Sequence, residues 1–330
     1  MKKHLTTIPA ALCAAAAFAL ALAPAPARAQ SNREPMRLVV GFAPGGALDA
    51  LARALSEQLA PLLNETVLVE NKPGASTMLS IDFVKRAKPD GRTILIASGP
   101  PFTIFPLSYT SLKYDYARDF RPVAHLTNNP AVISTSPHAP FRTFQDYVAA
   151  AKKDPDQRTF GLTSLGGALH FSIVGLGKEI GVPLTAVNYK GGAPLVTDIA
   201  GGHLPVGTDA LGSQLELHRA GRVRIIAVGG TERVKWLPEV PTVHELGYKG
   251  FDRATTFYGA YVPAGTPDEV VKKLEAALVQ AVRSAPVGAL LERAGIQATG
   301  LPAAHLAEQM KKDSAFWKPI VEASGFKVEQ

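Results

Sequence analysis

The sequence predicts an α/β fold built from many short strands and helices. Apolar, β-branched runs recur along the 330 residues with helical patterns between them, an alternation typical of parallel sheets. Hydrophobic residues make up 46% of the chain and charged residues 19%, which provides a sizeable core and excludes a disordered chain. The 29 glycines and 26 prolines are spread between the apolar runs, so they mark connections rather than one low-complexity tract.

Local patterns predict the elements in order. The apolar run Arg37–Val40 predicts a short buried strand, and Ala47–Leu62 carries apolar residues at helical spacing. Further strands are expected at Val67–Val69, Thr93–Ala97, Val132–Ser134, Thr185–Tyr189, Leu204–Val206, Val223–Val228 and Phe257–Val262. Further helices are expected at Thr77–Ala87, Thr143–Lys153, Ala168–Glu179, Pro194–Ala200, Ser213–Ala220, Pro267–Ser284 and Pro302–Ala323, with a Gly/Ser-rich loop at Gly161–Gly167.

The first 29 residues have the pattern of a secretory signal peptide. Lys2 and Lys3 precede an uncharged Ala/Leu-rich stretch, which ends at prolines and the small-residue pattern Ala27-Arg28-Ala29. We expect cleavage after Ala29 and export, which in a bacterium means the periplasm. Because Cys13 lies inside this segment, the mature chain has no cysteine and cannot hold a disulfide or a Cys-rich metal site.

The formal net charge of +7 includes the predicted signal peptide and is higher than that of the mature protein. Removing the signal peptide leaves 32 basic and 28 acidic residues, a net charge of +4. The basic residues are scattered, so nucleic acid is not an expected partner. The histidines show no paired metal-ligand spacing, and neither a metal nor a cofactor is expected.

No compositional break marks a linker between domains. One lobe can instead be interrupted by the other, with the chain crossing near residues 127–132 and 253–257. This arrangement assigns residues 30–130 and 256–330 to lobe 1 and residues 131–255 to lobe 2.

Two glycine-rich turns are the most informative local features. Val39–Asp49 runs from a strand through Gly45-Gly46 into a helix, where converging backbone N–H groups form an anion site. A similar turn occurs at Gly191-Gly192, and two such turns facing each other could hold both ends of a di- or tricarboxylate. The alternative is that each turn only makes a tight connection. Neither turn matches the dinucleotide pattern or the phosphate-binding P-loop.

Three polar residues near the glycine-rich segments are candidates for either a structural or a functional role. Asp49 either stabilises the first helical turn through the helix dipole or faces the ligand and tunes which carboxylate is accepted. Ser164 lacks the Gly-x-Ser-x-Gly setting of a hydrolase nucleophile, so a capping or ligand-contacting role is favoured. His170 is expected to be a structural helix residue. No catalytic residue is assigned, and an enzyme is not expected.

Taken together, these segments resemble the Bug family of extracytoplasmic solute receptors, the substrate-binding components of tripartite tricarboxylate transporters. The matching motifs span most of the mature chain: Pro44–Asp49 with Arg53, Glu70–Ala75, Tyr114-Asp115, Asp119-Phe120, Pro122-Val123, Gly161–His170, Tyr189–Gly191, Asp198, Gly201–His203, and Leu237–Thr242 with Glu245 and Gly247. The resemblance implies a two-lobed periplasmic-binding-protein fold of the type II kind, with a ligand cleft between the lobes and two hinge crossovers.

The resemblance also implies which residues hold the ligand, a small organic anion. They are Phe42, Ala43, Gly45, Gly46, Ala47, Asp49, Ser98, Ser164, Gly167, Tyr189, Thr208 and Asp209. The expected protein is a monomer whose partners are membrane transporter subunits. Delivery of the ligand signal to a sensor protein remains an alternative, and an exported hydrolase is a remote one.

Overall fold

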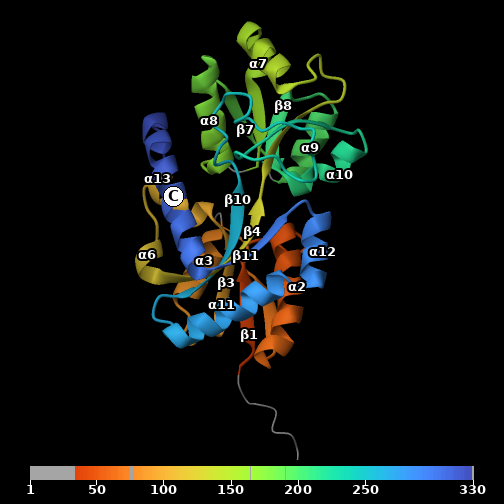
Figure 1. Cartoon of the computed structure of the whole chain (residues 1–330). Helices are drawn as coiled ribbons and strands as arrows, with labels where there is room; N and C mark the ends of the chain where they lie inside the picture. The colour runs from red at the N-terminus through yellow and green to blue at the C-terminus, as the bar shows by residue number, and fades with distance from the viewer. Residues whose placement is uncertain (1–33, 75–76, 164, 190, 329–330) are drawn as a thin grey trace, which may run out of the picture. The chain divides into compact units, whose positions relative to one another are not determined.

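The computed structural model describes residues 34–74, 77–163, 165–189 and 191–328. The predicted signal peptide lies outside these ranges, as do Ser164 and Lys190. Residues from Pro35 onward form one compact unit that contains two β-sheets (Figure 1).

The first sheet has six strands in the order β11-β4-β10-β3-β1-β2. Its strands β1, β2 and β3 are parallel, whereas β10 is antiparallel to both β3 and β4, and β11 is antiparallel to β4. The bounds of these strands are β1 (Met36–Val40), β2 (Val67–Asn71), β3 (Thr93–Ser98), β4 (Phe120–Asn129), β10 (Thr256–Pro263) and β11 (Gln297–Pro302).

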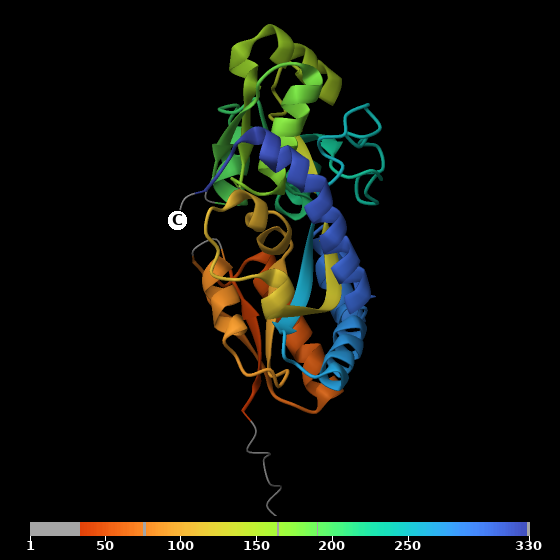
Figure 2. The ribbon, with the colours of Figure 1, turned by 90° about the vertical axis from the view of Figure 1, so that its left-hand side faces the viewer.

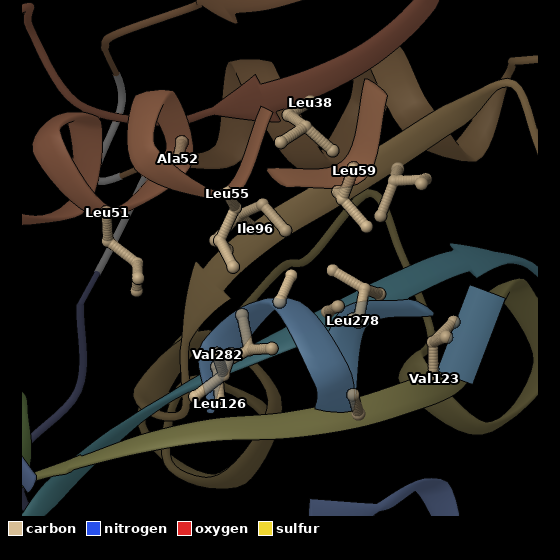
Figure 3. Packing of buried hydrophobic residues seen from close by; sticks show 14 of the residues in the cluster. Leu38, Leu51, Ala52, Leu55, Leu59, Ile96, Val123, Leu126, Leu278 and Val282 are labelled. Carbon is tan, nitrogen blue, oxygen red and sulfur yellow. The ribbon is translucent and has the colours of Figure 1, made fainter. Parts of the chain in front are cut away.

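Helix α2 (Ala47–Leu63) covers one face of this sheet because its apolar residues repeat every three or four positions. Leu51, Leu55 and Leu59 are fully or almost fully buried. They pack against Leu38 of β1 and residues of α11 (Asp268–Val282), as Figure 3 shows. This packing fixes the position of the N-terminus of α2 relative to the sheet.

The second sheet has five strands in the order β7-β6-β8-β5-β9, with parallel pairs β6–β7 and β6–β8 and antiparallel pairs on both sides of β5. Its core is richer in aromatic residues, among them Phe144, Tyr147, Phe160 and Phe251. The strands are β5 (Ala131–Thr135), β6 (Thr159–Leu162), β7 (Thr185–Asn188), β8 (Val206–Ala210) and β9 (Arg224–Val228).

The chain passes between the two sheets twice. Only Pro130 separates the end of β4 from the start of β5, and the chain returns through a segment without helices or strands, residues 229–255, into β10. The first passage lies within the expected crossover 127–132, and the second ends within the expected crossover 253–257. Thr256 of β10 pairs with Asn129 of β4, so both passages lie side by side at one end of the first sheet.

The remaining helices surround the two sheets. Figure 2 shows α13 running along the first sheet, and its contacts extend from β4 to α8 beside the second sheet. The helices are α3 (Met78–Lys85), α4 (Pro100–Thr103), α5 (Phe105–Ser108), α6 (Tyr116–Asp119), α7 (Phe144–Lys153), η2 (Pro155–Arg158), α8 (Ala168–Ile180), α9 (Gly192–Ala200), η3 (Leu211–Ser213), α10 (Leu215–Arg219), α12 (Ala285–Arg293) and α13 (Ala303–Ser324).

In the described part of the chain, no single helix has the length and apolar composition needed to cross a membrane. The pair α11 and α12, bent by 60° at a short break, passes that test on length and composition together. Six residues of α11 are buried within the protein, among them Leu278 and Val282.

The structure corrects several sequence predictions. The predicted strand Leu204–Val206 instead begins at Val206, the helix expected at Ser213–Ala220 is split into η3 and α10, and Gly161 belongs to β6 rather than to a loop. The sheets are also mixed rather than purely parallel, because the chain leaves the first sheet through β4 and returns through β10 in the opposite direction. The α/β class and its two sheets agree with the prediction.

Candidate functional site

The turn between β1 and α2 leaves the start of the helix open. Gly45 has φ +90°, a conformation that favours glycine, and Gly46 is the N-cap with no side-chain hydrogen bond to the helix. The first intrahelical bond is donated by the Ala50 N–H to the Gly46 carbonyl. The N–H groups from Gly46 to Asp49 therefore have no backbone partner within the helix and, with the helix dipole, favour an anion.

Asp49 is held inside this turn rather than toward solvent, with 3% of its surface exposed. Its Oδ2 accepts from the Gly45 N–H and Arg53 Nε at 2.9 Å each. Its Oδ1 accepts from Arg53 Nη2 at 3.0 Å and Asn71 Nδ2 at 2.9 Å. The Arg53 hydrogen bond and, to a smaller extent, those from Gly45 and Asn71 lower the Asp49 pKa to about 2 against the opposing effect of burial.

These four hydrogen bonds use the full acceptor capacity of the Asp49 carboxylate. Asn71 also donates to the Phe42 carbonyl at 3.0 Å, so β2 and α2 together fix the turn. Asp49 therefore acts as an anchor for the turn, and its charge is neutralised by Arg53.

A second glycine-led helix start comes from the other sheet. Helix α9 begins at Gly192 after Gly191, whose φ is +117°, and it too has no side-chain cap. By contrast, helix α7, whose ends are remote from these turns in sequence, has a complete capping box between Thr143 and Asp146. In α7, side-chain oxygens accept from the backbone N–H groups at the helix start. In α2 and α9 no N-cap side chain does so, and the backbone donors remain available.

A cavity of about 430 Å³ joins these two helix starts. It is lined by Gly46, Ala47, Asn129, Gly192, Ala193, Asp209, Ala210, Leu211, Gly212, Ser213, Tyr258, Ala294, Gly295 and Ile296. Asp209 is the only charged residue among the described lining residues. The cavity therefore combines donors from the first-sheet elements with one carboxylate from the second sheet.

Asn129 and Tyr258 contribute polar groups from the paired strands β4 and β10. Asn129 is 3% exposed and accepts from Thr127 Oγ1 at 3.1 Å, but its Nδ2 has no hydrogen-bond partner among the described residues. Tyr258 pairs across the strands with Thr127, which places it on the same face. Burial and, secondly, the charge of Asp209 raise the Tyr258 pKa to about 12, so the hydroxyl is neutral and can donate.

Asp209 is half-buried at the end of β8. Its Oδ1 accepts from Thr163 Oγ1, and its Oδ2 from Ser213 Oγ, at 2.9 Å each. Burial raises the Asp209 pKa, while hydrogen bonds from the Ala210 N–H, Ser213 and Thr163 partly oppose that rise. No ion pair joins Asp209 to a basic residue in the described ranges.

The structure brings only some of the predicted ligand-binding residues into this cavity. Gly46, Ala47 and Asp209 line it, and Ser164 lies outside the described residues. Predicted residues that do not line it are Phe42, Ala43, Gly45, Asp49, Ser98, Gly167, Tyr189 and Thr208.

Several of these residues have other contacts in the structure. Ser98 pairs with Tyr258 across the sheet, and Gly167 is the buried N-cap of α8. The Tyr189 hydroxyl donates to Asp198 Oδ2 at 2.8 Å, and Thr208 is fully buried. Because side chains alternate along a strand, Thr208 and its neighbour Asp209 face opposite sides of β8.

Asn129, Tyr258 and Ser213 line the cavity but were not among the predicted ligand-binding residues. Tyr258 lies in a correctly predicted strand, Phe257–Val262, but nothing in the sequence indicates which face borders a cavity. Asn129 ends β4, a strand that was not among those predicted from the sequence. The Asn-Pro pair at positions 129–130 was the available signal, since it marks a break in the chain.

Two larger hollows have a weaker claim to be the site. One of about 690 Å³ lies between α13 and the segment 229–255, and its arginine and lysine residues already have carboxylate partners. These ion pairs are Arg233–Glu245, Lys235–Glu292 and Arg253–Asp313. The other hollow, of about 750 Å³, is lined by residues between positions 137 and 222. All of them fall in the segment predicted to form lobe 2. Within the described ranges, no group of three or more His, Cys, Asp or Glu residues is placed to hold a metal.

Comparison with known proteins identifies the family of the chain. The profile of the tripartite tricarboxylate transporter family receptor (TctC) matches residues 51–326. The chain belongs to the TctC family. It is 32% identical over 288 residues to the UPF0065 protein in the tcbD-tcbE intergenic region of Pseudomonas sp. strain P51, covering 87% of this chain and 85% of that protein.

Solved structures of similar proteins share the fold of this TctC-family chain. MatC from Rhodopseudomonas palustris, solved with bound malate, is 26% identical with a TM-score of 0.76 and coverage of 87% and 98% of the two chains. A second R. palustris protein, solved with adipate, is 27% identical with a TM-score of 0.80 and coverage of 90% and 98%. The family relationship and the fold therefore agree with the resemblance inferred from the sequence, and the family is one of solute-binding receptors.

Proposed function

We propose that the chain is a periplasmic receptor that binds a small carboxylate in the cavity between α2 and α9 and delivers it to a membrane transporter. Membership of the TctC family supports this role. Similar proteins solved with malate and with adipate support a carboxylate as the ligand. The proposed function involves no chemical reaction, because capture and release need only hydrogen bonds and a change of conformation.

One observation carries the proposal. The buried Asn129 amide, which lacks a hydrogen-bond partner among the described residues, lines the same cavity as the open N-terminus of α2 at Gly46 and Ala47. An unpaired buried donor is costly, so a group that accepts from it stabilises the bound form. A carboxylate has the acceptor capacity and the charge to satisfy the amide and the helix N–H groups together.

The two passages between the sheets support closure around the ligand. Pro130 alone joins β4 to β5, and the return passage enters β10 beside it. We infer that small backbone rotations there change the separation of Gly46 and Gly192, as in hinge closure of two-lobed receptors. Ligand groups that touch both sides then favour the closed form.

The substitution Gly46→Val tests the position of the site. A Cβ added at Gly46 meets only the Ala43 carbonyl, at 3.9 Å, and the residue has a negative φ, so a side chain is accommodated without backbone strain. The valine side chain occupies space that the ligand carboxylate needs. We expect calorimetric affinity for the best-bound acid to fall by about a hundredfold or more, with a stability change of about 1 kcal/mol or less.

Gly288→Val is the matched control, because an added Cβ there meets no atom within 4 Å and Gly288 lies on α12, outside the lining of this cavity. Its affinity should equal that of the unsubstituted protein. A Gly46→Val protein that is folded and binds with unchanged affinity contradicts the assignment of the cavity.

Export and transport form the remaining part of the proposal. The mature periplasmic chain should begin after Ala29, which mass spectrometry of the isolated protein checks. Deleting the gene should abolish uptake of the radiolabelled ligand while leaving the membrane subunits present. Normal uptake together with loss of a ligand-induced transcriptional response would instead identify the partner as a sensor.

A further inference from the structure

The two walls of the cavity differ in chemistry. Elements of the first sheet contribute the α2 start at Gly46 and Ala47, the unpaired Asn129 amide and the neutral Tyr258 hydroxyl. All of these can donate hydrogen bonds. The second sheet and its helices contribute Asp209, whose carboxylate accepts hydrogen bonds.

Asp209 Oδ2 lies beside the first residue of α9. A Cβ added at Gly192 would lie 2.7 Å from Asp209 Oδ2, so this oxygen lies directly against the first residue of the helix. A second carboxylate brought to the same helix start would meet a like charge in a half-buried setting. The two helix starts are therefore not equivalent anion sites.

Asp209 also keeps capacity to accept a further hydrogen bond. Ser213 Oγ lies 2.9 Å from Asp209 Oδ2 and 2.8 Å from the Ala210 carbonyl. A serine hydroxyl has a single hydrogen, so the two acceptors must share it. Gly192 has no side chain to cover Oδ2 from its side.

We propose that the ligand carries a carboxylate at one end and a hydrogen-bond donor, a hydroxyl or an ammonium group, at the other. The carboxylate binds the α2 start and the Asn129 amide, and the donor binds Asp209. This inference rests on the proposed function and narrows its ligand class. It makes Asp209 the residue that selects against acids with a carboxylate at both ends.

The burial of Asp209 strengthens this selection. Burial raises its pKa because the ionised form loses hydration without gaining a cationic partner in the described ranges. A ligand ammonium supplies that partner, and a ligand hydroxyl supplies a donor. A site built around such a pair discriminates strongly against analogues that lack the donor.

Titration calorimetry on the mature protein with two matched series tests the proposal. The four-carbon series is succinate, 4-hydroxybutyrate, 4-aminobutyrate and butyrate, and the six-carbon series is adipate, 6-hydroxyhexanoate, 6-aminohexanoate and hexanoate. In at least one series, we expect the hydroxy or amino acid to bind about tenfold or more tightly than both the diacid and the unsubstituted acid. The diacid binding tightest in both series would overturn the proposal.

Asp209→Asn provides the second arm. It should lower the affinity for the amino acid and raise that for the diacid, so that their ratio changes by about tenfold or more. Asp156→Asn removes the same charge from an exposed residue outside the cavity and should leave the ratio unchanged. An unchanged ratio in folded Asp209→Asn protein would overturn the proposal.

Lys190 lies outside the described residues, so its charge is tested directly. Lys190→Met should leave the preference for the hydroxy or amino acid over the diacid unchanged. Reversal of this preference would show that the chain itself neutralises Asp209 and would overturn the inference.

If diacids bind but hydroxy and amino acids do not, this inference fails and the proposed function as a carboxylate receptor stands. If no carboxylate tried binds, in these series or in a wider thermal-shift screen, the proposed function fails.

Discussion

Asp49 and Asp209 both belong to strand-to-helix regions near the cavity, yet their surroundings shift the pKa of the carboxyl group in opposite directions. Asp49 receives four hydrogen bonds, two of them from Arg53, which lower its pKa to about 2. Burial raises the pKa of Asp209, which has no basic partner in the described ranges. The comparison indicates that Asp49 builds the turn, whereas the cost of burying Asp209 fits its proposed role in binding.

Matched isosteric substitutions give the largest expected difference between the two regions. At neutral pH, Asp49→Asn replaces a fully paired carboxylate by an amide whose NH₂ group faces hydrogen-bond donors. We expect the free energy of unfolding to fall by about 1–3 kcal/mol. Asp209→Asn should leave the protein equally stable or more stable, because it removes a half-buried charge that has no basic partner in the described ranges. Urea unfolding that shows equal losses for both variants would contradict the comparison.

The pH dependence of these effects should also have opposite signs. The folded-state pKa of Asp49 is lowered, so its contribution to stability is complete above its ordinary value of 3.8 and is lost as the pH falls toward about 2. The folded-state pKa of Asp209 is raised, so its ionisation costs stability as the pH rises through that pKa. Unfolding of each variant and of the unsubstituted protein between pH 2 and 7 measures both effects. The deficit of Asp49→Asn should shrink below about pH 4, and the same trend for both variants would refute this account.

A substitution at the capped start of α7 should change stability without changing ligand affinity. Thr143→Ala removes the side-chain acceptor for the Asp146 N–H and should cost about 1 kcal/mol of stability. Affinity for the best-bound acid should not change, because Thr143 does not line the cavity. A fall in affinity as large as that of Gly46→Val would remove the distinction between capped and open helix starts.

Gly192→Ala should lower the affinity less than Gly46→Val does. The added Cβ lies 2.7 Å from Asp209 Oδ2 and 3.0 Å from Ser213 Cβ, so the carboxylate must shift. Affinity should fall severalfold, roughly the effect of about 1 kcal/mol, while the helix itself gains up to about 1 kcal/mol in stability from the loss of glycine. Unchanged affinity would mean that the position of Asp209 is not important for binding.

Most elements with a strong hydrophobic periodicity were predicted from the sequence. Strands that form mainly because they pair with neighbouring strands were missed. β4 contains Pro122, His125 and two terminal asparagines, which weaken the strand pattern, yet it pairs with both β10 and β11. The predicted helices Ala47–Leu62 and Ala168–Glu179 each end one residue before the observed helix, because apolar spacing and a glycine-led start define them locally.

A motif that determines backbone shape can place residues at a cavity before the fold is known. Gly46 and Ala47 line the cavity because the turn itself forms the helix start. Asn129 and Tyr258 could not be predicted, since their place in the cavity depends on the register of two antiparallel strands that are distant in sequence. The anchoring of Asp49 by Asn71 likewise depends on the parallel pairing of β1 with β2.

A crystal structure with the tightest-binding acid of the two series tests the central claim most directly. The account predicts one carboxylate within hydrogen-bond distance of the Gly46 and Ala47 N–H groups and of Asn129 Nδ2. It also predicts a hydroxyl or ammonium group on Asp209. A carboxylate bound at the α9 start beside Gly192, or the ligand in another hollow of the protein, would contradict it.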